Sequence, residues 1–295
     1  MRVFLSIDIG GTRIKTGLVE ESGALLTRGT MPLPGDWEEF TAAVEQQFAQ
    51  ANTQHPVAGV AIASPGIVNP ATGTVAGMSA RTVDFIMGQP FYSLRQRLGV
   101  PVWLEQDANC AVLGEYWQGN ARGLGSAMAL VLGAGLGGGV LLNGRIHRGA
   151  HLLGGDVGYI CPSANHNEDR LSTHLSPISA AAKYTRQTGR TLTLPEMHAA
   201  RETDPVAASL YDQWLGGLAV LILTMHYTLD PEVFLLGGGI SEWELLCPEV
   251  QRKLEELSCC QYCPQLPMVR PCLHRNSANL LGAVYALLLG EKGIY

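Results

Sequence analysis

The sequence lacks any unbroken apolar run of about 18 residues, the length that a helix needs to cross a bilayer. It also lacks an apolar leader with basic flanks, because a strand-like pattern already begins at residue 3. Basic residues are in the minority, with 20 Lys and Arg against 26 Asp and Glu and a net charge of −6. Such a balance disfavours a surface for nucleic acid or anionic membranes. We therefore expect neither nucleic-acid nor membrane partners.

Cysteine is too sparse and too unevenly placed to suggest a disulfide framework. The seven cysteines are also an odd number, which favours a reducing, cytoplasmic setting. The remaining composition is that of a globular protein, with 46% hydrophobic residues and 35 glycines in 295 positions. A chain of this length is sufficient for a large core and about two domains.

Glycine is concentrated in one informative stretch, residues 128–143. Apolar β-formers lead into Gly133, Gly135 and Gly137–Gly139, and apolar character resumes at Val140. This pattern indicates a strand, a tight turn and a second strand. Bare backbone N–H groups around such a turn form a concavity that suits a phosphate. The alternative is an ordinary glycine-rich hairpin.

The same pattern occurs near the N-terminus, which favours the phosphate interpretation. Residues 3–19 again show a strand, a turn at Gly10-Gly11 and a strand. A second turn follows in each copy, Glu21–Gly23 in the first and Asn143-Gly144 in the second. Such self-similarity predicts two similar domains facing each other across a cleft, with a nucleotide between them.

Three glycine motifs in this order resemble those of the ROK (repressor, open reading frame, kinase) sugar kinases. Asp8–Lys15 is similar to their first phosphate motif and Leu132–Gly139 to their second, while Leu235–Ser241 resembles the turn that packs on adenosine. The resemblance runs nearly end to end and is nearest to the zinc-free β-glucoside kinase branch. It implies an α/β, two-domain actin/hexokinase-like (ribonuclease H-like) ATPase fold with an inter-domain cleft, ATP and Mg²⁺ as cofactors, and a homodimer.

The resemblance also implies domain limits and nucleotide contacts. The small domain would span residues 1–111, with the helix 277–291 packed back on it, and the large domain residues 112–276. Residues at the three glycine motifs would bind ATP: Asp8, Gly10, Gly11, Thr12, Lys15, Gly133, Ala134, Gly135, Gly137, Gly237, Gly238 and Gly239.

Asp107 is the candidate catalytic residue. It follows the predicted strand 100–104 and precedes an apolar helix, so it could simply be the N-cap of that helix. However, ligands of open α/β sheets bind at the carboxyl ends of strands, where a carboxylate can accept a proton from a hydroxyl. The family resemblance places the catalytic base at Asp107, and Mg²⁺ with ATP near Asp8 and Asp107.

The expected sugar contacts come from two other loops and from the residue before the base. The turn Ser64-Pro65-Gly66 resembles the family's Pro-Gly loop, and Ser64 has no obvious His or Asp partner for a hydrolase mechanism. By resemblance, Gln106, Asp156 and Tyr159 lie where the family holds sugar hydroxyls.

Four departures from the family pattern fall in this site. Gln106 replaces an Asn, Ala134 replaces a Thr, and Asp156 with Tyr159 replaces the usual Glu and its ring-ended partner. A further family Glu falls around residues 173–174, where no carboxylate occurs. Mismatched polar groups discriminate strongly between substrates, so the substrate is atypical or the activity weak.

Two functions are therefore open. The first is ATP-dependent phosphorylation of a sugar hydroxyl, expected to be the 6-hydroxyl of a glucose-type hexose or β-glucoside. The second is a catalytically weak or inactive sugar-binding regulatory protein of the same fold. The family's DNA-binding regulators carry a helix-turn-helix ahead of the first phosphate strand, and here that strand begins at residue 3.

We expect no structural zinc site. Zinc-binding family members continue after the sugar loop with a His and a Cys-rich loop, whereas this chain has Tyr159 and then only Cys161. The set Cys259–Cys263 with Cys272 and His274 has one zinc-like spacing, but its first pair is adjacent. His147 and His151 are four residues apart, but they lie on a glycine-bearing loop rather than a clear helix, so we do not expect them to bind a metal.

The apolar periodicity predicts the remaining elements. Strands are expected at three places within residues 3–31 and at residues 57–62, 100–104, 233–236 and 267–273, and helices at residues 37–51, 178–189, 195–200, 204–229, 242–257 and 277–289.

Overall fold

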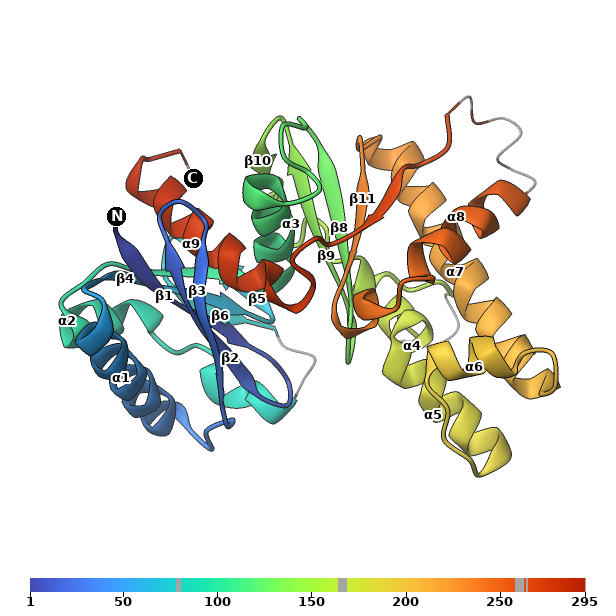
Figure 1. Ribbon diagram of the computed structural model, residues 1–295, viewed down its shortest axis with the longest axis horizontal. Helices are drawn as coiled ribbons and strands as arrows, with labels where there is room; N and C mark the ends of the chain where they lie inside the picture. Colours follow the sequence, from blue (N-terminus) through green and yellow to red (C-terminus); the bar gives the residue numbers. More distant parts are fainter. Residues whose placement is uncertain (78–80, 164–168, 258–262, 264, 295) are drawn as a thin grey trace. The chain divides into compact units, whose positions relative to one another are not determined.

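The computed structural model describes residues 1–77, 81–163, 169–257, 263 and 265–294. They form two compact α/β units (Figure 1). The first unit comprises Met1–Arg122, Arg145–Gly154 and Ser277–Tyr295, and the second comprises Gly123–Gly144 and Gly155–Asn276. The first unit thus extends beyond the predicted limit at residue 111, because that position lies inside a helix that packs within this unit.

The sheet of the first unit has the strand order β3-β2-β1-β4-β7. β1, β2 and β3 pair antiparallel, whereas β4 lies parallel to both β1 and β7. The three antiparallel strands predicted within residues 3–31 are confirmed. The strands of this unit are β1 (Val3–Ile9), β2 (Ile14–Glu20), β3 (Leu25–Met31), β4 (Val57–Ser64), β5 (Ile67–Asn69), β6 (Thr74–Ala76) and β7 (Val102–Gln106).

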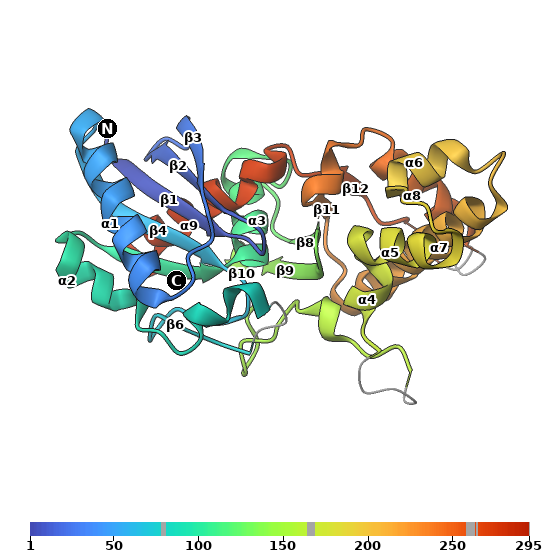
Figure 2. The same cartoon turned by 90° about the horizontal axis from the view of Figure 1, so that it is seen from below.

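Alternation along β1 directs its side chains to two different helical layers. Val3, Leu5, Ile7 and Ile9 pack in the core that contains Phe40 of α1 (Trp37–Gln54). Phe4 points the other way, into the core formed with the C-terminal helix α9 (Ala278–Glu291). Figures 1 and 2 show α1 and α9 on opposite faces of this sheet. Ser6 and Asp8 share the face of Phe4 because they lie two and four residues further on.

Helices α3 (Asp107–Gln118) and α9 approach each other backbone to backbone. A Cβ atom on Gly282 would lie 1.7 Å from the carbonyl oxygen of Cys110. On Gly114 it would lie 2.3 Å from the carbonyl oxygen of Ala278. No side chain fits at either distance, so both positions require glycine. The first unit also holds α2 (Leu94–Leu98) and the 3₁₀ turns Arg81–Ile86 and Phe91–Ser93.

The second sheet repeats the strand order of the first, as β10-β9-β8-β11-β12. β8 and β9 form an antiparallel hairpin, and β11 lies parallel to β8 and β12. This matching order confirms the internal similarity predicted from the glycine stretches. Asn143 and Gly144, with φ of 53° and 71°, form the tight turn after β9. The strands are β8 (Ala127–Leu132), β9 (Leu136–Leu142), β10 (Arg145–Ile146), β11 (Phe234–Gly237) and β12 (Val269–Pro271).

The predicted helices 178–189, 195–200 and 204–229 are confirmed, whereas α4 was not predicted and the region near residue 242 differs. There a 3₁₀ turn, Gly239–Glu242, precedes α8, which begins only at Leu246 because Gly238 has a φ of +86° and ends the strand in a sharp turn. β12 is also shorter than predicted, since it ends at Pro271. The helices are α4 (Leu171–Leu175), α5 (Pro177–Thr188), α6 (Leu194–Ala200), α7 (Pro205–Leu229) and α8 (Leu246–Glu256), with a 3₁₀ turn at Val157–Tyr159.

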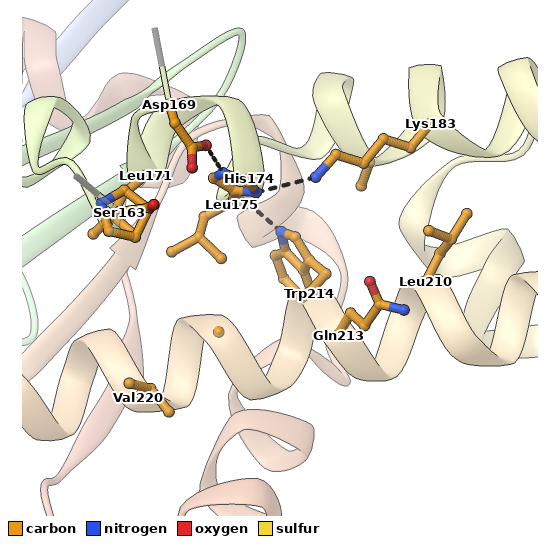
Figure 3. A pocket seen from close by; sticks show the side chains of 13 residues that line it. Ser163, Asp169, Leu171, His174, Leu175, Lys183, Leu210, Gln213, Trp214 and Val220 are labelled. Atoms are coloured by element: carbon orange, nitrogen blue, oxygen red, sulfur yellow. Dashed lines mark hydrogen bonds and ion pairs between the residues drawn. The ribbon is translucent and has the colours of Figure 1, made fainter. Parts of the chain in front are cut away.

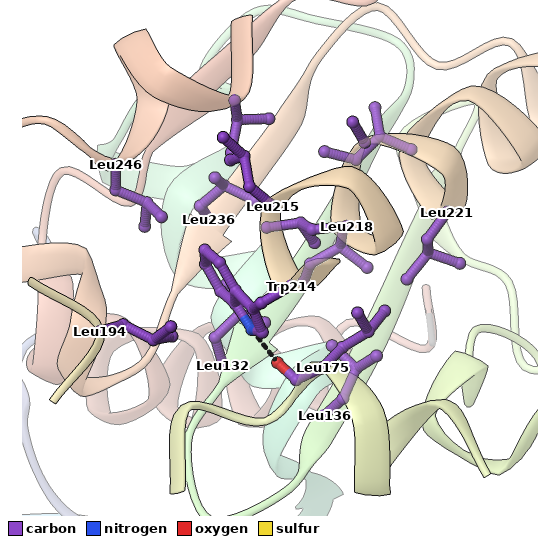
Figure 4. Close-up of a cluster of buried hydrophobic side chains, with 14 of the residues drawn as sticks. Leu132, Leu136, Leu175, Leu194, Trp214, Leu215, Leu218, Leu221, Leu236 and Leu246 are labelled. Atoms are coloured by element: carbon purple, nitrogen blue, oxygen red, sulfur yellow. Dashed lines mark hydrogen bonds between the residues drawn. The ribbon is translucent and has the colours of Figure 1, made fainter. Parts of the chain in front are cut away.

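Helix α7 forms the centre of the second core. Trp214, Leu215 and Leu218 pack with leucines of the neighbouring strands and helices (Figure 4). By length and composition α7 could cross a membrane, although the sequence has no unbroken apolar run of about 18 residues. However, 56% of its most apolar window is buried inside the protein, as in the core helix of a globular domain.

Replacing Gly282 with alanine tests the contact between α3 and α9. We expect Gly282→Ala to lower the free energy of unfolding by about 3 kcal/mol, because the added methyl group meets backbone that cannot rotate away. Urea denaturation measures the change. Gly216→Ala in α7 is the matched control, since its Cβ would lie an ordinary 3.6 Å from Lys253 and the helix gains up to about 1 kcal/mol. Equal stability of both variants would contradict the packing described.

Candidate active site

The first unit gathers polar residues at one edge of its sheet. β1, β4 and β7 are adjacent and parallel, so their carboxyl ends meet at that edge. The register places Asp8 opposite Ala63, and Ser64 opposite Gln106. Asp107 follows directly after Gln106. Sequence-predicted residues from three separate segments are therefore neighbours at the position where open α/β sheets bind ligands.

Asp8 is a buried carboxylate with two partners. Its side chain accepts hydrogen bonds from Lys15 Nζ at 3.1 Å and from Asn279 Nδ2 at 3.2 Å. Asn279 belongs to α9 and was not predicted, although an amide within an otherwise apolar helix was a usable signal. The turn that follows is closed by Gly10, whose N–H donates to Arg13 O at 3.2 Å. Thr12 lies exposed at the tip of this turn, with Gly11 partly exposed beside it.

Asp107 is the first residue of α3 rather than its N-cap. The cap is Gln106, whose side chain accepts a hydrogen bond from Asn109 N at 3.3 Å. The alternative interpretation of Asp107 as the N-cap is therefore wrong. Its partly exposed carboxylate accepts a hydrogen bond from Ala108 N at 2.8 Å. A helix N-terminus stabilises the ionised carboxylate, which is the form that can accept a proton.

A buried ion pair lies at the same strand end. Glu105 is 1% exposed, and its carboxylate contacts Arg148 Nη2 at 2.5 Å and Asn109 Nδ2 at 2.9 Å. The backbone N–H of Gln106 also donates to Glu105, at 2.9 Å. These contacts fix the backbone directly before Asp107. Sequence reasoning missed Glu105 and Arg148, because the partners lie 43 residues apart and only the fold brings them together.

The pKa of the Cys110 thiol reflects the carboxylates that lie near the start of α3. Burial raises the pKa of its thiol well above the usual value, and the nearby charges of Glu105, Asp8 and Asp107 raise it further. The thiol therefore stays protonated and does not act as a nucleophile.

The Pro-Gly loop at the end of β4 presents backbone rather than a hydroxyl. Ser64 is fully buried, and its Oγ donates to Pro65 O at 3.0 Å. Gly66 has a φ of 92°, which the turn requires. Pro65 and Gly66 are the partly exposed members of the predicted trio.

The second unit places two glycine turns at the ends of adjacent strands. β8 and β11 are parallel, with Gly237 opposite Val131. After β8, the N–H of Gly133 donates to Gly135 O at 2.9 Å, and Ala134 is exposed at the tip. Gly137 continues into β9.

The turn after β11 requires glycine at its centre. Gly238 has a φ of +86°, and a Cβ there would lie 2.2 Å from Leu132 O, at the end of β8. Gly239 follows it and faces open space. Close approach of the two turns therefore depends on the absence of a side chain.

Ser172 on α4 is a further residue that the sequence did not reveal. Its Oγ accepts a hydrogen bond from Leu136 N at 3.0 Å, at the base of the turn after β8. The same oxygen would lie 3.0 Å from a Cβ on Gly135. Ser172 thus fixes one arm of the predicted phosphate turn.

The predicted sugar loop packs tightly on β9. A Cβ on Gly158 would lie 2.0 Å from Leu136 O, and one on Gly138 would lie 2.1 Å from Gly155 O. Asp156, partly exposed, precedes the 3₁₀ turn and accepts a backbone hydrogen bond from Tyr159 N at 3.1 Å. Tyr159 as a whole residue is 40% exposed. Both predicted sugar ligands therefore lie on a loop that packs closely against the sheet.

A mainly apolar pocket of about 390 Å³ lies beside Gly239 in the second unit. Apolar and small side chains form most of its wall, and Glu242 is its one charged lining residue. A mostly apolar lining with a few polar groups is typical of small-molecule sites. The pocket is lined by Pro177, Ile178, Ala181, Thr193, Leu194, Pro195, Gly239, Ile240, Glu242 and Trp243.

Comparison with known proteins identifies the family. The family model described as "ROK family" matches residues 4–289. The chain belongs to the ROK family. A β-glucoside kinase from Listeria innocua is 31% identical to this ROK protein over 97% of this chain and 98% of its own length.

Two solved structures match the fold over nearly the whole chain. A ROK family protein from Streptococcus pneumoniae, in complex with sucrose, is 30% identical with a TM-score of 0.88 over 99% of both chains. A ROK family glucokinase from Streptomyces griseus, in complex with glucose and AMPPNP, is 26% identical with a TM-score of 0.79 over 95% of this chain and 97% of its own. This ROK protein therefore has the predicted actin/hexokinase-like ATPase fold.

The predicted absence of structural zinc stays a prediction for this ROK protein. Within the described parts of the chain, no three His, Cys, Asp or Glu side chains gather as metal ligands. Cys272 is buried, whereas Cys259 and Cys260 lie outside the described residues.

Removing Arg148 tests the buried ion pair. We expect Arg148→Met to destabilise the protein by about 3–5 kcal/mol, because the carboxylate of Glu105 stays buried without its cation. Arg2→Met is the control: it removes exposed pairs with Glu21 and Glu291 and should cost less than about 1 kcal/mol. Chemical denaturation compares the two. If Arg148→Met is no more harmful than Arg2→Met, the pair does not hold this edge of the sheet.

Proposed function

We propose that this ROK-family sugar kinase transfers the γ-phosphoryl group of ATP to the 6-hydroxyl of a glucose-type hexose or β-glucoside. The observation that carries the proposal is the position of Asp107. Its partly exposed carboxylate lies at the carboxyl edge of three parallel strands, one of which carries Asp8. The choice of sugar is supported by the similarity to a β-glucoside kinase and to a glucokinase that binds glucose.

Asp107 is the proposed general base. A sugar hydroxyl that donates a hydrogen bond to this carboxylate is oriented for attack on the γ-phosphorus, and Asp107 receives its proton as the new P–O bond forms. Gln106 caps α3, and the ion pair of Glu105 fixes the end of β7. The side chain of Asp107 is therefore positioned without serving as the helix cap. Positioning and charge neutralisation supply most of the rate in such reactions.

ATP is proposed to bind through the glycine turns of both units. The amides around Gly133–Gly135 and Gly10–Thr12 face the phosphates, and the pocket beside Gly239 receives the adenine. Lys15 adds a cation next to Asp8.

The residues present fit a magnesium ion bound with the phosphates. Asp8 supplies a carboxylate, the ligand type that Mg²⁺ prefers, and Asp107 supplies another near this strand edge, where Glu105 is already paired with Arg148. When bound, Mg²⁺ supplies charge neutralisation of the phosphate oxygens.

The sugar is proposed to contact Asp156 and Tyr159 on the loop of the second unit and Gln106 with the Pro-Gly loop of the first. Asp156 accepts hydrogen bonds from sugar hydroxyls, whereas the amide of Gln106 can both donate and accept. These side chains differ from the family's usual set, so we propose that they select an atypical glucose-type substrate. A cytoplasmic homodimer is part of the same proposal and rests on the family resemblance.

The alternative is a sugar-binding regulator with weak or no turnover. It is favoured by the absence of a hydroxyl at Ala134, which is exposed at the tip of the phosphate turn. It is disfavoured by the retained carboxylates Asp8 and Asp107, because sugar binding alone requires neither a phosphate site nor a base.

Asp107→Asn tests the base directly. Turnover should fall by ~10²–10⁴ while sugar affinity stays within about tenfold, because the amide keeps the hydrogen-bonding shape but cannot accept the proton. Steady-state kinetics and calorimetry measure the two effects. Asp84→Asn removes an exposed carboxylate of the same unit and should leave turnover unchanged. Near-normal turnover in folded Asp107→Asn would falsify the assignment.

Ala134→Thr tests the phosphate turn after β8. The added hydroxyl can donate to a phosphate oxygen, and a hydrogen bond to a charged group contributes roughly 1.5–3 kcal/mol. Because Ala134 is exposed, its turn has room for the larger side chain. We expect kcat/KM for ATP to rise several-fold.

Ala134→Val is the matched control for that experiment, since it adds the same bulk without a donor and should bring no gain. An equal effect of both substitutions, or none from threonine, would place the ATP phosphates elsewhere.

A further inference from the structure

A second cavity, of about 430 Å³, lies in the second unit between α4, α5 and α7 (Figure 3). It contains none of the residues assigned above to ATP or the sugar, although His174 lies at the family position around residues 173–174 where this chain has no carboxylate. Its wall combines a polar group of side chains with a larger apolar surface. The lining residues are Pro162, Ser163, Asp169, Leu171, His174, Leu175, Ala180, Lys183, Leu210, Gln213, Trp214, Gly217 and Val220.

Three titratable side chains contact one another in a row along one wall of this cavity. The carboxylate of Asp169 contacts Nε2 of His174, and Nδ1 of His174 lies 3.4 Å from Lys183 Nζ. Figure 3 shows the three arranged in that order. A carboxylate accepts and an ammonium donates, so this geometry assigns the N–H of His174 to Nε2 and the acceptor to Nδ1. The ammonium of Lys183 is thereby oriented with one of its three hydrogens on the ring.

The charge of Lys183 is not balanced by a contacting carboxylate. Throughout the described parts of the chain, no acidic side chain lies within ion-pair distance of its Nζ atom, and His174 is its one hydrogen-bond partner. Two ammonium hydrogens therefore remain for an acceptor supplied by solvent or a ligand. A partly exposed ammonium beside an apolar wall can pair with the anionic group of a ligand whose body lies on that wall.

The rest of the cavity is suited to hydrocarbon. Leu171, Leu210 and Val220 line it, and Val220 is 53% exposed where the cavity meets solvent. The indole N–H of Trp214 donates to Leu175 O at 2.8 Å, so this donor is already occupied. Trp214 therefore offers the cavity only carbon surface.

We propose that this cavity binds a small organic anion with an apolar body. The anionic group accepts hydrogen bonds from Lys183, and the body lies against Leu171, Leu210 and Val220. Pockets of this size with a mostly apolar lining and a few convergent polar groups are typical of small-molecule sites. The site is independent of the kinase assignment, because none of its residues takes part in the reaction proposed above.

Hexanoate is a suitable probe because it combines one carboxylate with a short alkyl chain. The protein has five tryptophans, and Trp214 alone among them lines the cavity. A titration followed by ¹H–¹⁵N NMR should shift the indole resonance of Trp214 saturably. The indole resonances of Trp37, Trp103, Trp117 and Trp243 should stay in place and serve as internal controls. Trp214→Phe assigns the resonance.

Three comparisons decide between an anion site and a merely apolar cavity. 1-Hexanol, without the charge, and inorganic phosphate, without the alkyl chain, should each bind about tenfold more weakly than hexanoate. Lys183→Gln should weaken hexanoate by about tenfold, whereas Arg186→Gln, an exposed charge on the same helix, should not. No saturable shift at Trp214, equal binding of hexanol, or unchanged affinity in Lys183→Gln would each overturn the proposal.

Discussion

The close approach of α3 and α9 is the constraint on which the first unit depends. Gly114 and Gly282 let the two backbones meet, and this contact holds the last helix of the chain against the first sheet. The same helix supplies Asn279 to the carboxylate of Asp8, while α3 begins with Asp107. Two acidic groups that lie almost a hundred residues apart in sequence thus take their positions from one helix pair. A side chain at either glycine would separate the helices and disturb both.

The second constraint is a sheet topology that occurs twice, each time with a glycine turn after its central strand. In each sheet the central strand, β1 or β8, is the first strand of a hairpin. Its antiparallel partner lies on one side of it, and the parallel strands lie on the other. The two glycine turns proposed to bind phosphate follow β1 and β8, the corresponding central strands. Parallel neighbours then bring further loops to the same edge: the Pro-Gly loop and Asp107 in the first unit, and the turn at Gly237–Gly239 in the second. Duplication of one topology therefore supplies both of the turns that we propose as phosphate-binding from a single local pattern.

Features set by local pattern were predictable from the sequence. Alternating apolar residues and glycine turns gave both hairpins, and apolar periodicity gave α5, α6 and α7 within a few residues. What escaped prediction depends on distant contacts. The pair of Glu105 with Arg148 and the bond from Leu136 to Ser172 join segments 43 and 36 residues apart. The cap of α3 escaped for a different reason: Gln106 and Asp107 are adjacent and both can accept a backbone hydrogen bond, so geometry alone decides between them.

The central claim is that the chain is an ATP-dependent sugar kinase with a functional site. A coupled assay of ATP consumption across a panel of free hexoses and β-glucosides, with purified protein and Mg²⁺, tests it most directly. The account predicts that at least one glucose-type sugar raises ADP formation far above the sugar-free rate, and that the product carries phosphate on its 6-oxygen. Saturable sugar binding by calorimetry, with ADP formation at the sugar-free rate for every member of the panel, would contradict it and favour the regulator.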